Sequence, residues 1–123
     1  MKILIIIARV LLGLAFVVFG LNAFLHFMPG EPPKGLAGDF VKALFQSRYF
    51  MAVAVFQIAG GALCLIGKFV PLGLTLLGPV IVNILLFHIF LEPKGLPLAI
   101  GVSVIALFLL AAYRKSFKGL VTP

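Results

Sequence analysis

Acidic residues are scarce in this chain. Asp and Glu together number 3 among 123 residues, and charged residues of both signs make up 11% of the sequence. A soluble domain carries roughly a quarter charged residues, so an ordinary water-exposed surface is excluded. No His, Asp and Glu residues occur together at the spacing of metal ligands either, which argues against a metal-dependent hydrolase.

Cysteine and catalytic motifs are equally sparse. The single Cys64 excludes an internal disulfide, a CxxC redox pair and a cysteine-rich metal site. We expect it to be a small buried hydrophobe rather than a reactive thiol. Nucleophilic triads, phosphate-binding loops and dinucleotide fingerprints are missing. The chain has no self-contained catalytic motif, so any enzymatic role would be as a subunit of a membrane oxidoreductase.

Apolar sequence is abundant, at 63% of the residues. It is concentrated in four runs, at about 3–27, 49–66, 69–90 and 96–113, close to the roughly 17 to 25 residues that a helix needs to cross a membrane. The first run could instead be a cleavable signal peptide, but it is long, its basic segment is thin, and Leu21-Asn22-Ala23 is a poor cleavage site. We predict an all-α, membrane-spanning four-helix bundle that forms a single domain over residues 1–123.

The connections between the runs differ in length. Those at 67–68 and 92–95 are short, which makes the second, third and fourth spans antiparallel neighbours. The first connection is long and contains apolar residues at helical spacing, namely Leu36, Phe40, Val41, Leu44 and Phe45. This pattern predicts a short amphipathic helix at the membrane surface. The helix could lead into the second span or act as a lid.

The net charge of +7 comes from Lys and Arg in the connections and the tail. No RNA-binding signature accompanies them, so we expect no nucleic-acid partner. Basic residues that flank apolar spans determine topology and contact anionic lipids. With both termini in the cytoplasm, that side carries the larger set, Lys2, Arg9, Lys68, Arg114, Lys115 and Lys118, against Lys34, Lys42, Arg48 and Lys94. Arg9 could extend to the head groups or pair inside the bundle.

Five polar side chains interrupt the apolar runs: Asn22, His26, Gln57, Asn83 and His88. In hydrocarbon an unpaired amide or imidazole costs several kcal/mol, so such groups usually point inward. In the antiparallel arrangement four of them lie toward the non-cytoplasmic end and Gln57 lies nearer mid-membrane. We predict that they line one outward-opening pocket; the alternative is that they link helices by hydrogen bonds.

His88 has a carboxylate, that of Glu92, one helical turn away. That carboxylate would orient the imidazole, as suits a proton relay or a quinone site. Asn83 lies more than about 100° around an ideal helix from His88, although Pro79 could alter this phase. Haem ligation is not favoured, because both histidines are near helix ends and nothing beyond their number supports it.

The sequence resembles the DoxX-like family of small four-helix membrane proteins. The resemblance covers most of the chain and is carried by segments 8–13, 19–22, 57–61, 67–73 and 79–88. It implies a four-helix bundle in the cytoplasmic membrane of a bacterium. Some members of that family are linked to respiratory sulfur oxidation as quinone-reducing subunits and others to oxidative-stress complexes, while related proteins assist membrane-protein assembly.

Two functional hypotheses follow. In the first, the chain is a lipophilic-ligand-binding subunit, with a quinone or similar molecule held by the five polar residues and the helices holding its tail. In the alternative, it is a non-enzymatic scaffold or assembly factor that grips another membrane protein. A transporter would need a homo-oligomer, because four helices are few for alternating access. Membrane lipids are partners in every case.

Overall fold

The computed structural model describes residues 1–25 and 33–123, and every regular element in them is helical. Four long helices, α1 (Lys2–Leu25), α3 (Tyr49–Ile66), α4 (Val70–Phe90) and α5 (Leu96–Ala112), are joined by shorter ones. The shorter elements are α2 (Gly35–Gln46), η1 (Pro93–Gly95), α6 (Arg114–Phe117) and η2 (Lys118–Leu120). Four segments are long and apolar enough to cross a membrane. The predicted all-α four-helix bundle is confirmed, and this is the architecture of an integral membrane protein.

The predicted span boundaries agree with the helices to within a residue or two. α3 has the predicted bounds, whereas α4 begins one residue later than predicted because Phe69 adopts a left-handed conformation, with φ 55°. In the described residues α1 ends at Leu25, and the last two residues of the predicted first span lie outside them. Local hydropathy was therefore sufficient to place the spans.

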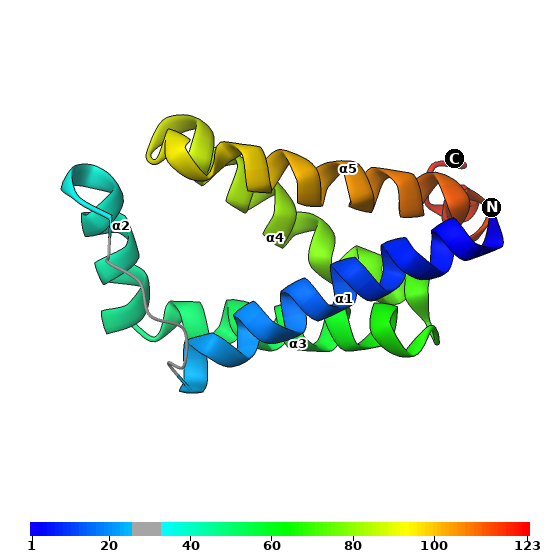
Figure 1. Ribbon diagram of the computed structural model, residues 1–123, viewed down its shortest axis with the longest axis horizontal. Helices are drawn as coiled ribbons and strands as arrows, with labels where there is room; N and C mark the ends of the chain where they lie inside the picture. Colours follow the sequence, from blue (N-terminus) through cyan, green and yellow to red (C-terminus); the bar gives the residue numbers. More distant parts are fainter. Residues whose placement is uncertain (26–32) are drawn as a thin grey trace.

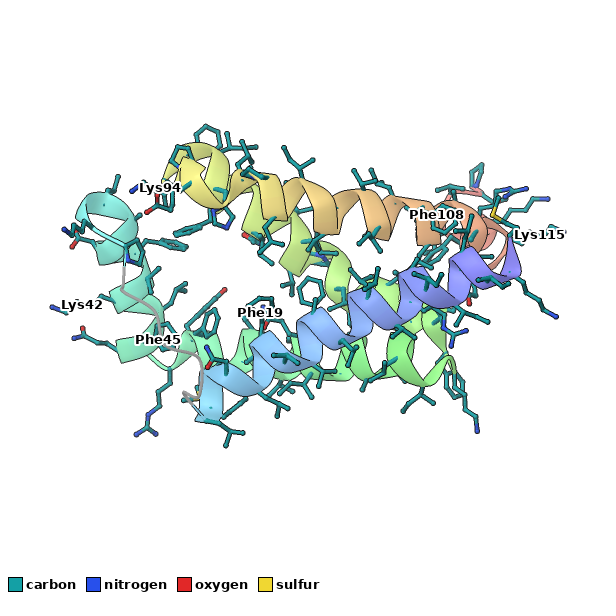
Figure 2. All side chains as sticks on the ribbon, viewed as in Figure 1. Phe19, Lys42, Phe45, Lys94, Phe108 and Lys115 are labelled. Carbon is teal, nitrogen blue, oxygen red and sulfur yellow. The ribbon has the colours of Figure 1, made fainter. Side chains whose placement is uncertain are left out.

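The four long helices form a ring in which α1 contacts α3 and α5, and α4 contacts the same two helices. Successive long helices run in opposite directions, so both chain termini lie at one end of the bundle, and α2 crosses the other end (Figure 1). Basic side chains mark both ends: Lys115 is at the end with the termini, and Lys42 and Lys94 are at the end with α2 (Figure 2). Large apolar side chains such as Leu11 and Val104 are exposed along the spans, as suits a lipid environment.

Close backbone contact between the helices depends on two adjacent glycines in α3. A Cβ atom on Gly61 would lie 2.9 Å from the carbonyl oxygen of Gly13 in α1, and one on Gly60 would lie 2.9 Å from that of Gly73 in α4. Consecutive helical residues point about 100° apart, so the two glycines serve two different neighbours. Small residues of this kind let membrane helices approach closely.

Arg9 fixes the end of α3 nearest the chain termini. Its side chain is half-buried, and Nε donates a hydrogen bond to the carbonyl oxygen of Cys64 at 3.1 Å. Gly67 follows α3 in a left-handed conformation, with φ 85°, and a Cβ there would lie 2.5 Å from the guanidinium. A cation at a helix C-terminus donates hydrogen bonds to the unpaired carbonyls and interacts favourably with the negative end of the helix dipole. Arg9 therefore pairs within the bundle, and Cys64, 0% exposed, is a buried hydrophobe as expected.

Candidate functional site: an apolar pocket at the α2 end of the bundle

A pocket of about 440 Å³ lies between α2, α3 and α4, at the end of the bundle away from the termini. This is within the usual range of small-molecule sites, roughly 300 to 1,000 Å³. From α3 it is lined mostly by apolar and aromatic side chains, namely Tyr49, Phe50, Val53 and Phe56, together with the amide of Gln57. The lining contains no Lys, Arg, Asp or Glu among the described residues, so a charged ligand would find no counter-ion there.

The amphipathic helix α2 forms one wall of this pocket. Phe40, Val41 and Leu44, at the i, i+1 and i+4 positions of one face, all line it. The Phe40 ring packs against the Phe87 ring of α4, with centroids 5.6 Å apart. Of the two predicted roles, α2 therefore does more than lead into the next span, because its apolar face encloses the space between α3 and α4.

α4 lines the pocket with two neighbouring rows of side chains, each at i, i+4 spacing: Thr75, Pro79, Asn83 and Phe87, then Leu76, Val80, Ile84 and His88. Such a row shifts by about 40° around the helix at each step, so the lining winds along α4. Asn83 and His88 can consequently line one pocket without sharing one face of an ideal helix. The predicted phase conflict between them is thereby resolved.

Gln57 is the most enclosed polar side chain in the lining. It is 6% exposed, and its Oε1 atom has no hydrogen-bond partner in the part of the chain that the structure describes. In the antiparallel pair of α3 and α4, contact between Gly60 and Gly73 places Gln57 level with Leu76. Gln57 therefore lies at the deep end of the pocket, and its oxygen does not link two helices as the packing hypothesis required.

The polar side chains of α4 are partly engaged with the backbone of α4 itself. Asn83 donates from Nδ2 to the carbonyl oxygen of Pro79 at 2.8 Å, and Thr75 donates from Oγ1 to that of Pro71 at 2.8 Å. Pro79 has no N–H, so the carbonyl of Thr75 loses its helical donor. Thr75 was missed in the sequence analysis, although its position one turn before a helix-interior proline could have indicated it.

His88 lies near the end of α4 and is oriented by the backbone. Its Nδ1 atom is 2.9 Å from the carbonyl oxygen of Glu92, and since a carbonyl only accepts, Nδ1 carries the hydrogen. In the neutral ring, Nε2 is then an acceptor. The prediction that the Glu92 carboxylate orients His88 was wrong. The chain turns after α4 and brings the backbone carbonyl of Glu92 to the imidazole ring instead. The ring also lies against Gly95, where a Cβ would be 2.6 Å from Nδ1.

The structure brings three of the five predicted residues together: Gln57, Asn83 and His88 line one pocket. Asn22, half-buried on α1, does not line it, because the third helix of the pocket is α2 rather than α1. His26 lies outside the described residues. Within those residues, no group of three or more His, Cys, Asp or Glu side chains could hold a metal ion.

The three pocket residues lie at different depths. From the level of Gln57, at Leu76, to His88 is twelve residues of α4, or about 18 Å at 1.5 Å per residue. Asn83 lies between them. The polar groups therefore do not surround one head group; they are distributed along an elongated apolar pocket. That shape suits a ligand with a polar head and a long apolar body.

Comparisons with known proteins add no identity: no protein-family model, curated protein or solved structure matches this chain.

Proposed function

We propose that this chain is a DoxX-like membrane protein that binds a neutral lipophilic molecule, of which a quinone-type ring is the best-suited class, in the pocket between α2, α3 and α4. The observation that carries the proposal is Gln57, a buried amide whose oxygen has no partner among the described residues and which lines an apolar pocket. Leaving a buried acceptor unsatisfied costs about 1 to 3 kcal/mol. Buried polar groups without a partner are expected mainly at functional sites, where proteins break the rules that stabilise the rest of the fold.

The rest of the lining supports a neutral ligand with a ring and an apolar chain. Aromatic side chains from all three helices, Phe40, Phe50 and Phe87, can pack against a planar ring. Without a lysine, arginine or carboxylate among the described lining residues, a carboxylate or ammonium head group would be buried unpaired, at high cost. The chain would supply binding and positioning within a membrane oxidoreductase rather than catalysis of its own.

The proposal includes a topology in the bacterial cytoplasmic membrane, with both termini in the cytoplasm. Basic residues favour the cytoplasmic side, and the end of the bundle with the termini has the larger set, as counted from the sequence. The pocket would then lie in the half of the membrane nearer the opposite side, where α2 covers it at the membrane surface. Labelling of single cysteines placed at Lys42 and Lys115 in intact cells would test this orientation.

The test of ligand binding is mass spectrometry of small molecules extracted from the gently purified protein. We expect a neutral lipophilic species at about one per chain, and its loss in Gln57→Leu. Ser103→Ala is the matched control, because Ser103 bonds to the carbonyl of Ala99 within α5 and does not line the pocket. An empty wild-type protein, or equal loading of the Gln57→Leu variant, would contradict the proposal.

A scaffold function is the second candidate, and α5 is the observation that favours it. Ala99 and Leu109 are its only buried residues, and a Cβ on Gly101 would meet nothing within 4 Å. A helix of another membrane protein, or of a second copy, could pack closely there. This function predicts a partner that co-purifies with the wild-type chain and is lost in Gly101→Leu, whereas the ligand-binding function predicts no effect of that substitution on the bound molecule.

A further inference from the structure

The two ends of the bundle differ in charge. Among the described residues, the end with the chain termini, called the basic end below, has no Asp or Glu and carries Lys2, Arg9, Lys68, Arg114, Lys115 and Lys118. At the α2 end, Asp39 and Glu92 offset part of the charge of the basic residues Lys34, Lys42, Arg48 and Lys94. No described acidic side chain therefore neutralises the basic end.

Most of the cations at the basic end are available to a partner. Arg9 is half-buried and donates to the carbonyl of Cys64. Arg114 gives Nη1 to the carbonyl of Ala111, which leaves the other donors of its guanidinium available. The exposed members of the set are Lys2, Lys68, Arg114, Lys115 and Lys118. Clusters of roughly four to eight Lys and Arg residues beside a membrane span attract anionic lipid head groups.

The segment that follows α5 is held against the bundle. Tyr113 and Phe117, one helical turn apart, are half-buried and pack against the hydrophobic core that contains Leu12 and Leu109. Lys115, between them in sequence, lies at the same end of the bundle as the start of α1 (Figure 2). The cations of this segment are therefore fixed at one end of the molecule together with Lys2.

Large apolar side chains accompany these cations. Phe69 is 73% exposed and directly follows Lys68, while Leu120 and Val121 are 75% and 83% exposed and come shortly after Lys118. All three lie just beyond the ends of membrane spans, where head groups meet hydrocarbon. A nucleic acid would neutralise the cations but leave these apolar groups in water, whereas an anionic lipid satisfies both.

We propose that the basic end is a binding site for anionic phospholipids. The exposed cations contact the lipid phosphates, and Phe69, Leu120 and Val121 enter the adjacent apolar layer. The segment after α5 is the main element of the site, because it supplies three of the cations and two of the apolar side chains. This site is separate from the pocket at the α2 end, so it does not depend on the proposed ligand.

Native mass spectrometry of the full chain in a non-ionic detergent measures this binding. The probes are phosphatidylglycerol and phosphatidylcholine with the same acyl chains, which differ in the charge of the head group and share the apolar part. We expect the wild type to bind phosphatidylglycerol at least about 10-fold more tightly, because several Lys and Arg residues each contribute to the attraction. Raising the salt concentration should reduce this preference, since exposed charges are screened.

Two triple variants with the same change in charge locate the site. Arg114→Gln/Lys115→Gln/Lys118→Gln should remove most of the preference for phosphatidylglycerol, whereas Lys34→Gln/Lys42→Gln/Lys94→Gln should keep it. All six side chains are exposed, so neither variant should disturb the fold, and circular dichroism checks this.

A double variant tests the apolar contact. Leu120→Ser/Val121→Ser should weaken both lipids by a similar factor and leave their ratio unchanged, because both lipids have the same acyl chains.

Four results would overturn the inference. Equal binding of the two lipids to the wild type would do so whether or not any variant folds. An equal loss in both triple variants would show that net charge, and not the basic end, attracts the lipid. Unchanged binding in Leu120→Ser/Val121→Ser would remove the apolar contact. Displacement of phosphatidylglycerol from the wild type by an RNA oligonucleotide would assign the surface to a nucleic acid instead.

Discussion

The two ends of the bundle are built from the same helices but packed in opposite ways. Toward the chain termini, α3 meets α1 and α4 through glycines, and a Cβ on Gly13 or Gly73 would lie within 2.8 Å of a backbone atom of α3. Toward α2, the corresponding positions of α3 carry Phe50 and Phe56, and a pocket of about 440 Å³ lies beside them. α1 stays close to α3 even there, since a Cβ on Gly20 would lie 3.1 Å from the carbonyl oxygen of Ala54. The large residues of α3 therefore accompany a wider separation from α4 alone.

α2 makes the open end possible. Where α3 and α4 separate, the Phe40 and Phe87 rings meet at 5.6 Å and close the space from the membrane surface. The tight end supplies rigidity, since backbones in direct contact cannot shift without collision. The open end supplies volume. Substitutions that affect one end and leave the other intact would test this division.

The largest expected effect is at the tight end. Gly61→Ala would place a methyl group 2.9 Å from the Gly13 carbonyl oxygen and 3.0 Å from the Val17 nitrogen, both backbone atoms that cannot rotate away. We expect a loss of about 1 to 3 kcal/mol in the free energy of unfolding, measured by denaturant titration in micelles. Gly78→Ala, in the same fold but with nothing within 4 Å, is the control and should change it by less than about 0.5 kcal/mol. Equal effects of both would show that close contact does not hold α1 and α3 together.

Removing the cation at the end of α3 should have the next largest effect. Arg9→Ala leaves the Cys64 carbonyl without its side-chain donor, and we expect a loss of about 1 to 2 kcal/mol, reduced because the arginine is half-buried. Arg114→Ala is matched, since that arginine also donates to a helical carbonyl, Ala111, but is exposed. Thermal unfolding followed by circular dichroism should separate the two variants; coincident midpoints would argue that the Arg9 contact contributes nothing.

At the open end, Gln57→Leu should raise stability while it removes the polar group from the pocket. Replacing an unsatisfied buried amide with an apolar side chain of similar size should stabilise the ligand-free protein by about 1 kcal/mol. The same denaturant titration, with detergent exchanged to remove bound molecules, measures this. Destabilisation instead would indicate that Gln57 is a packing residue whose amide holds the helices together.

The smallest expected effect on stability is that of Gly95→Ala. Gly95 has φ −88°, which alanine adopts readily, but the added methyl would collide with the His88 ring. We expect the ring to turn away and lose its contact with the Glu92 carbonyl, with less than about 1 kcal/mol lost. Side-chain NMR of His88 should show a changed nitrogen environment in Gly95→Ala. Gly119→Ala is the control, because a Cβ there meets nothing within 4 Å, and it should leave the His88 signals unchanged. An unchanged His88 spectrum in Gly95→Ala would contradict the contact between Gly95 and the His88 ring.

Much of the fold could be predicted from the sequence because its signals are local. The bounds of α3, Tyr49–Ile66, followed from hydropathy and length, and the spacing of Leu36, Phe40 and Leu44 was enough to predict α2. Polar residues within apolar runs identified three members of the pocket lining, Gln57 among them. These inferences depend only on neighbours along the chain.

The errors came from contacts between distant elements. Asn22 was expected to line the pocket with Gln57. α1 does pass close to Gln57, since a Cβ on Gly20 would lie 3.3 Å from the Gln57 Cβ, but Asn22 does not line the pocket and α2 forms its third wall. The Glu92 carboxylate was expected beside His88, but the direction of the chain after α4 decides which atom reaches the ring. Hydrophobic periodicity predicts neither which faces of two helices meet nor the course of the chain after α4.

The sequence by itself determined that this is a four-span helical membrane protein with an amphipathic helix in its first connection and a small set of polar residues within the spans. The tertiary structure alone decided which of those residues share a space, at what depth each lies, and that the oxygen of Gln57 has no partner among the described residues. The physical reason is that periodicity fixes the direction of a side chain relative to its own helix axis, whereas a pocket depends on how each helix is rotated and shifted against its neighbours.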